Sequence, residues 1–104
     1  MKIKKILNQF HNELKAVYGS RLKKVILYGS WAVGKANDQS DIDLAIVLEG
    51  TVQPGKEIDK LIDIITDINL EYSALLSVYP VSETDYKNCQ SPLLINIRKE
   101  GIAA

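Results

Sequence analysis

The sequence predicts an α+β domain in which a short mixed β-sheet is flanked by helices. Apolar residues recur at helical spacing over residues 3–18 and 58–72, and short β-prone apolar runs cover residues 25–28, 41–48 and 74–81. Helical and strand patterns therefore alternate along the chain. With 104 residues, the chain has room for a single domain, residues 1–104, with a modest core.

The first two helices are predicted from their apolar stripes. The first stripe ends at Gly19-Ser20, which is a helix stop signal, and the second follows a loop over residues 49–55. We expect the second stripe to pack on the sheet. The two stripes consist of Ile3, Ile6, Leu7, Phe10, Leu14, Val17 and Tyr18, and of Ile58, Leu61, Ile62, Ile65, Ile68 and Tyr72.

The three strand segments differ at their ends. Residues 25–28 are predicted to form a central strand, which ends in a sharp turn at Gly29-Ser30. Residues 41–48 are apolar apart from the first few. Residues 74–81 include Pro80, which cannot donate to a sheet ladder, so this strand is predicted to lie towards an edge.

Two shorter helices are predicted in the last quarter of the chain. Residues 82–85 are typical of a helix N-terminus, with Asp85 at the position of a capping-box acid. In the tail, Pro92 lies just inside a helix start and Gly101 just past its end. The apolar residues of this tail exceed what one helix face needs, which indicates either core packing or a partner contact.

Composition and charge exclude several classes of function. Thirteen Lys and Arg offset thirteen Asp and Glu, so no global positive field attracts nucleic acid, which could bind only through a local patch; we expect no direct binding. The single cysteine, Cys89, cannot form an internal disulfide. No run approaches the roughly 20 apolar residues of a membrane span. We therefore expect a cytoplasmic protein without a membrane role.

The acidic pair Asp41 and Asp43 is the principal candidate for chemistry. On a strand, residues i and i+2 point to the same face, which places these two carboxylates about 6.5 to 7 Å apart at the backbone. Two acids so close repel each other unless a cation lies between them. Mg²⁺ binds one or two carboxylates together with substrate phosphates, and a pair of such ions serves phosphoryl transfer.

Gly29 and Ser30 are the candidate phosphate-binding residues. A glycine turn lets the backbone approach a phosphate, and the N–H groups of a following helix together with the Ser30 hydroxyl can hold it. For Ser30 and Asp41 to share a ligand, the end of the first strand must lie beside the start of the second. The two strands are therefore predicted to run antiparallel.

The combination of Gly29-Ser30, ten intervening residues and Asp41-Ile42-Asp43 resembles the motif of the DNA polymerase beta-type nucleotidyltransferase superfamily. The whole chain is similar to the small MNT branch, including residues 26–30, 40–44 and 97–102. The resemblance implies the nucleotidyltransferase fold and Mg²⁺-dependent transfer of AMP from ATP. It also implies an antitoxin of the MntA type, which silences a partner HEPN-domain RNase toxin (HepT type) by modifying a tyrosine of that toxin.

The sequence departs from the superfamily pattern in two ways. A third carboxylate is usual on a later strand, yet residues 75–79 contain none, and Glu71 on the preceding helix is the nearest. A tyrosine phenol, with a pKa near 10, needs less help from a base than an alcohol does. The segment after Gly-Ser usually carries arginine, whereas here Lys35 is the only cation, either as a nucleotide contact or as a solvated loop residue.

Two rival functions remain open from the sequence. One is an antitoxin that binds the toxin without turnover, motivated by the missing third acid. The other is a small-molecule nucleotidyltransferase of the aminoglycoside-modifying kind, which usually carries a further helical domain. The sequence also leaves open the base preference, the number of AMP units, and whether the Asp59, Asp63 and Asp67 stripe is a solvated face or a dock for a basic toxin. His11, without a second His or Cys near it, is given no role.

Overall fold

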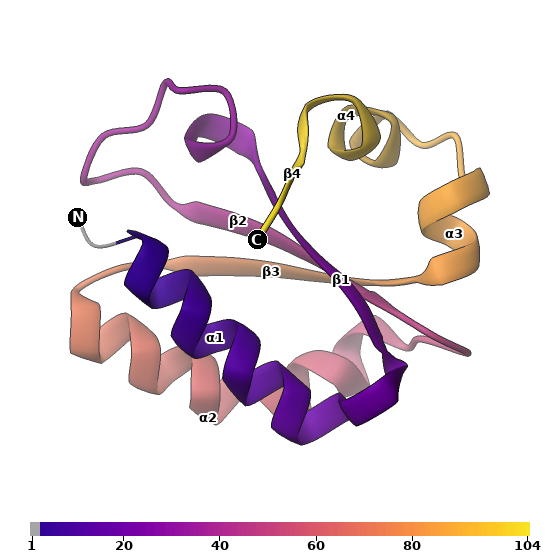
Figure 1. Ribbon diagram of the computed structural model, residues 1–104, viewed down its shortest axis with the longest axis horizontal. Helices are drawn as coiled ribbons and strands as arrows, with labels where there is room; N and C mark the ends of the chain where they lie inside the picture. The colour runs from indigo at the N-terminus through magenta and orange to yellow at the C-terminus, as the bar shows by residue number, and fades with distance from the viewer. Residues whose placement is uncertain (1–2) are drawn as a thin grey trace.

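The computed structural model describes residues 3–104 and confirms the α+β class (Figure 1). The strands are β1 (Leu22–Tyr28), β2 (Ile42–Leu48), β3 (Leu76–Ser82) and β4 (Ile102–Ala103). They form one sheet in the order β3-β2-β1-β4, in which β2 and β3 run parallel and the other pairs antiparallel. Met1 and Lys2, the start of the predicted amphipathic N-terminal segment, lie outside the described residues.

The predicted pairing of the first two strands is confirmed. β1 and β2 are antiparallel and central, and Tyr28 at the end of β1 pairs with Asp43 near the start of β2. β3 lies at the edge, as Pro80 indicates, and the N–H of Leu76 is capped by Asn69 Oδ1 at 2.9 Å. The two-residue strand β4 was not predicted, because so short a run carries no periodicity.

Helices cover both faces of the sheet. Figure 1 shows α1 (Ile3–Tyr18) and α2 (Pro54–Tyr72) on one side, and α3 (Glu83–Asn88) and α4 (Pro92–Glu100) on the other. Ser82 and Ser91 cap α3 and α4 by accepting a backbone N–H, which confirms the two predicted helix starts. Helix α2 begins at Pro54, inside the predicted loop, because proline in the first turn forfeits no helical hydrogen bond.

The core follows the alternation of side chains along the strands. Leu44 and Ile46 face α1 and α2, whereas Ala45 and Val47 face α3 and α4. From the helices, the fully or nearly fully buried apolar and aromatic side chains are Ile6, Phe10, Leu14, Tyr18, Leu61, Ile65, Ile68, Leu94 and Ile97. Val17 and Ile62, which were assigned to the apolar stripes, are 41% and 48% exposed because they lie at the margins of their helix faces. Among the described residues, no helix has the length and apolarity needed to cross a bilayer.

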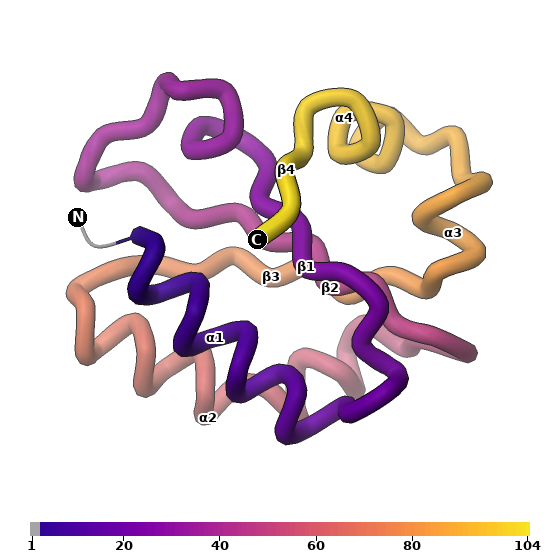
Figure 2. Tube along the Cα trace, in the orientation of Figure 1, coloured from indigo at the N-terminus to yellow at the C-terminus, as the bar shows by residue number. Residues whose placement is uncertain are grey.

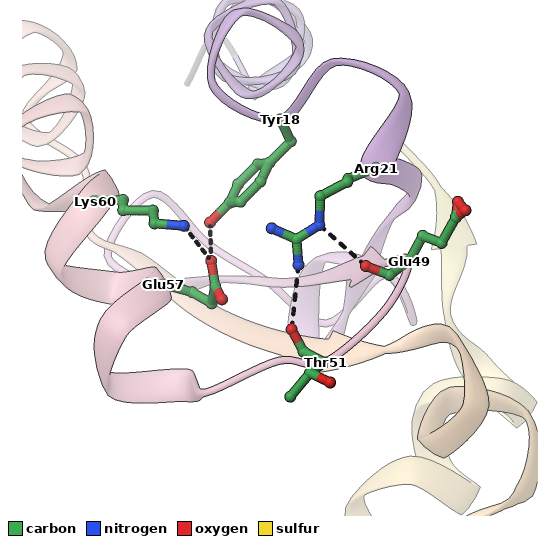
Figure 3. Close-up of polar contacts among 6 residues, drawn as sticks. All are labelled: Tyr18, Arg21, Glu49, Thr51, Glu57 and Lys60. Atoms are coloured by element: carbon green, nitrogen blue, oxygen red, sulfur yellow. Dashed lines mark hydrogen bonds and ion pairs between the residues drawn. The ribbon is translucent and has the colours of Figure 1, made fainter.

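A polar cluster joins the end of α1 to the start of α2 (Figure 3). The Tyr18 hydroxyl donates to Glu57 Oε1 at 3.0 Å, and Lys60 Nζ lies 3.5 Å from the same oxygen. Glu57 is only 4% exposed. Arg21 donates to the carbonyl oxygens of Glu49 and Thr51, which ties the loop after β2 to the end of α1. The cluster therefore satisfies a buried carboxylate that would otherwise destabilise the fold.

Tyr18→Phe is expected to lower the free energy of unfolding by about 1–3 kcal/mol, because it leaves the buried Glu57 carboxylate with Lys60 alone. Burial and Glu57 raise the pKa of Tyr18 well above its ordinary value, so the folded state retains a proton that the unfolded chain loses above about pH 10. This contribution to stability is therefore lost as the pH rises through the alkaline range.

Urea unfolding of the wild type and the Phe variant at neutral and alkaline pH measures both effects. The difference between the two proteins should shrink at high pH. Tyr86→Phe is the control, because the Tyr86 hydroxyl has no hydrogen-bond partner among residues 3–104. An equal loss of stability in the two variants would contradict the assignment.

Candidate active site

Gly29 and Ser30 form a tight turn at the end of β1. Gly29 has φ +72°, a left-handed conformation that favours glycine, and its carbonyl accepts the N–H groups of Ala32 at 3.0 Å and Val33 at 3.3 Å. The segment Gly29–Trp31 is a single 3₁₀ turn and not the start of the α-helix that the sequence suggested. The expected N–H groups of a following α-helix are therefore absent, and only the backbone N–H groups of one turn and the exposed Ser30 side chain are available to a phosphate here.

Asp43 packs directly against this turn. It lies in β2 opposite Tyr28, and a Cβ atom built on Gly29 would lie 2.3 Å from Asp43 Oδ2 and 3.2 Å from its Cγ. Only glycine leaves room for the carboxylate at this position. The structure thus places the Gly-Ser turn and the acidic segment in contact, across ten intervening residues.

Asp41 lies one residue before β2, which begins at Ile42. The prediction that Asp41 is a strand residue is therefore wrong. Its side chain is exposed. The N–H of Ile42 nevertheless donates to the Leu75 carbonyl at 2.9 Å, which holds the backbone next to Asp41 against the start of β3. Asp41 and Asp43 therefore lie at the same end of the sheet, although their relative orientation is not set by strand alternation.

The electrostatics of the pair fit a cation. Partial burial, and then the negative charge of Asp41, raise the pKa of Asp43 above its ordinary value. A divalent ion would remove this unfavourable interaction, and carboxylate oxygens are the ligands that Mg²⁺ prefers. The donor set, the Gly29 cradle and the adjacent turn therefore fit one metal ion shared with nucleotide phosphates.

No third carboxylate lies on the strand beside Asp43. In the parallel pairing of β2 and β3, Ser77 lies beside Asp43, and its side chain is exposed. Glu71, the nearest acid in sequence, lies on α2 and accepts a hydrogen bond from Gln9. Within residues 3–104 no group of three His, Cys, Asp or Glu side chains could hold a metal. The site thus offers two carboxylates and no imidazole.

Two tyrosines on the Asp43 face were not identified from the sequence. Tyr28 and Tyr79 are partly buried against the cluster under α3 and α4. Burial, then Asp43 and Tyr79, raise the pKa of Tyr28, so its hydroxyl stays protonated near the acids. These hydroxyls are therefore hydrogen-bond donors and not bases at neutral pH. The antiparallel register of the first two strands is the signal that could have placed Tyr28 beside Asp43.

Hydrogen bonds hold the segment of residues 31–40, which lies between the Gly-Ser turn and Asp41. Trp31 Nε1 donates to the Ser40 carbonyl at 3.4 Å, and the N–H of Lys35 donates to the Ser30 carbonyl at 3.0 Å. The Lys35 side chain is exposed, and its contact with a nucleotide stays a prediction. Trp31, the one tryptophan of the chain, is thus a residue that links the Gly-Ser turn to the start of the acidic segment.

Comparison with known proteins gives the family. The family model described as "Polymerase beta, Nucleotidyltransferase" matches residues 1–103. Two proteins of Methanocaldococcus jannaschii, both named "Putative protein adenylyltransferase", are 39% identical over 83 residues and 32% identical over 77 residues. These matches cover 80% and 74% of this chain, and 77% of each relative.

A solved structure extends the comparison to the fold. A crystal structure described as that of "a putative nucleotidyltransferase" from Sulfolobus solfataricus superposes on this chain with a TM-score of 0.58 at 19% identity. The match covers 95% of this chain and 76% of that one. At this identity the likeness shows the fold alone. Since the family match spans nearly the whole chain, this protein belongs to the polymerase beta-type nucleotidyltransferases.

Proposed function

We propose that this protein transfers AMP from ATP to a tyrosine hydroxyl of a partner protein, a HEPN-domain RNase toxin, and thereby silences it. The observation that carries the proposal is the contact between Asp43 and the Gly29-Ser30 turn, with Asp41 beside it. Such a site has carboxylates for a metal and a turn for phosphates. The adenylyltransferase names of the two archaeal relatives support a protein as acceptor.

In this reaction the phenol oxygen of the acceptor forms a bond to the α-phosphorus of ATP. The bond from that phosphorus to the oxygen bridging to the β-phosphate breaks, and pyrophosphate leaves. Ser30 and the N–H groups of the turn would hold the terminal phosphates, and Asp41 and Asp43 would hold Mg²⁺. Bound Mg²⁺ would neutralise charge that develops on the phosphates and the leaving group.

The identity of Ser77 favours a phenol as the acceptor. Since Ser77, which pairs with Asp43, cannot act as a general base, the acceptor proton would pass to solvent. A phenol of pKa near 10 ionises far more readily than an aliphatic hydroxyl. The site therefore suits tyrosine better than serine, threonine or ribose.

The test is to incubate the protein with MgCl₂, ATP and its HEPN-domain partner, and to measure the intact mass of the partner. We expect the mass of one or more AMP units, located on tyrosine by peptide sequencing, and none with EDTA or with the acceptor tyrosine changed to Phe. Modification of serine instead would contradict the assignment of the acceptor.

The same experiment distinguishes AMP transfer from a second candidate function, inhibition of the toxin by binding alone. The absence of a third carboxylate beside Asp43 also suits an antitoxin that binds its toxin without turnover. In that case the two proteins would co-elute in size-exclusion chromatography, the RNase would be inhibited, and the partner would gain no mass.

A further inference from the structure

A basic groove lies along the outer edge of β1, at the end of the strand opposite the Gly-Ser turn. Two adjoining cavities of about 350 and 410 Å³ share His11, Lys23 and Lys24 in their linings. The second cavity adds Lys15 from α1. Neither lining includes an Asp or a Glu, although the chain as a whole carries no net charge. The lining of these two cavities therefore carries three lysines and no acidic side chain.

The floor of the first cavity is apolar. It is made by Ile26 of β1, which is buried on the same face of the sheet as Tyr86, and by Gly101 to Ala104 of the C-terminal segment. Val25 also lines the cavity, but its side chain is buried on the opposite face of the sheet. This segment runs from α4 alongside β1, with which β4 pairs, and ends near α1 (Figure 2). His11 Nδ1 lies 3.1 Å from the Ala104 carbonyl oxygen. An aromatic wall is supplied by Tyr86, whose ring lies 5.4 Å from Lys24 Nζ. The groove thus combines an apolar floor, an aromatic side chain and a cationic rim.

We propose that this groove binds single-stranded nucleic acid. Sequence-tolerant recognition of single strands uses a positively charged groove with aromatic side chains against which bases stack. Lys15 and Lys24 would contact phosphates, and a base would pack between Tyr86 and the apolar floor. Lys23 contributes less, because its ammonium group lies 3.4 Å from the Glu49 carboxylate.

An added peptide strand fits the same edge less well. The register of β1 shifts between Leu22 and Lys24, and the two consecutive lysines Lys23 and Lys24 lie at this bulge. Bulges and edge lysines both oppose the pairing of a further strand. The groove is also distinct from the transfer site, because Lys23 precedes Tyr28 by five strand residues, about 17 Å. The proposal is therefore independent of the transfer reaction. It runs counter to the expectation of no direct nucleic-acid binding, which rests on the charge balance of the whole chain.

The test uses a fluorescein-labelled oligoadenylate RNA of eight nucleotides and measures anisotropy with EDTA present. For the two phosphate contacts of Lys15 and Lys24, we expect affinity to fall about sevenfold between 50 and 200 mM salt. The variant Lys15→Glu with Lys24→Glu should weaken binding at least tenfold at 50 mM salt. The matched control, Lys56→Glu with Lys99→Glu, has the same net charge and should bind within twofold of the wild type. Tyr86→Leu should weaken binding about fivefold or more.

Several results would overturn the proposal. One is no binding at 50 mM salt, and another is an equal loss in the groove variant and the control variant. Displacement of the RNA by ATP at an equal concentration of phosphate groups would assign the groove to a free nucleotide instead. Stronger binding of a labelled oligoglutamate peptide, lost in the groove variant, would assign it to an acidic protein segment. Circular dichroism of each variant checks that it is folded.

Discussion

Asp43→Asn is expected to reduce AMP transfer about a thousandfold. The neutral amide is a much poorer ligand for Mg²⁺ than a carboxylate, and metal stabilisation of phosphoryl transfer is worth several kcal/mol, at about 1.4 kcal/mol for each tenfold change in rate. Asp41→Asn should have a similar effect through the same metal. The rate of AMP transfer to the partner at saturating ATP and Mg²⁺ measures both. Glu13→Gln, which changes an exposed acid on α1, is the control and should leave the rate unchanged.

Asp43→Asn should also stabilise the metal-free fold. Because the pKa of Asp43 is raised in the folded state, ionisation costs stability, and the wild type loses this stability as the pH rises through the range in which Asp43 titrates. The Asn variant has no such charge. In EDTA at neutral pH, it should therefore unfold at a higher temperature than the wild type, and the difference should vanish in acid. If Asp43→Asn retained transfer activity, Asp43 would not be a catalytic residue. If it were less stable than the wild type in EDTA, the unfavourable charge assigned to Asp43 would be wrong.

Gly29→Ala is expected to damage the site and the fold together. Its Cβ would clash with Asp43 Oδ2 at 2.3 Å, and its φ of +72° is strained for any L-residue. A displaced carboxylate no longer holds the metal against the turn, and a misplacement of about 1 Å costs about a hundredfold in rate. The left-handed backbone adds about 1–2 kcal/mol of lost stability.

Gly34→Ala separates these two effects. Gly34 has φ +74° in the same loop, but nothing lies within 4 Å of its Cβ position. This variant should lose the backbone contribution to stability and keep its rate of transfer. Thermal unfolding and single-turnover transfer, measured on both variants, provide the comparison. Equal rates in the two proteins would show that the contact between Gly29 and Asp43 does not shape the site.

The sequence alone determined the four helices and three of the four strands. The apolar stripes predicted α1 and α2, and the serine and proline signals predicted the starts of α3 and α4, because these are local properties of the chain. The motif spacing and the requirement for a shared ligand also predicted that β1 and β2 are antiparallel. The sequence named Gly29, Ser30, Asp41 and Asp43 as one site, and it also showed that a third acid was missing.

Only the tertiary structure decided what surrounds these residues. The packing of Asp43 on Gly29, the neighbouring Ser77 of β3, and the groove between α1 and the C-terminal strand all join residues far apart in the chain. Local patterns carry no record of such contacts, since strand register and helix docking depend on the whole core. The 3₁₀ turn after Gly29 and the start of β2 at Ile42 were misassigned for the same reason. Tertiary packing, and not local preference, sets where each of these elements begins.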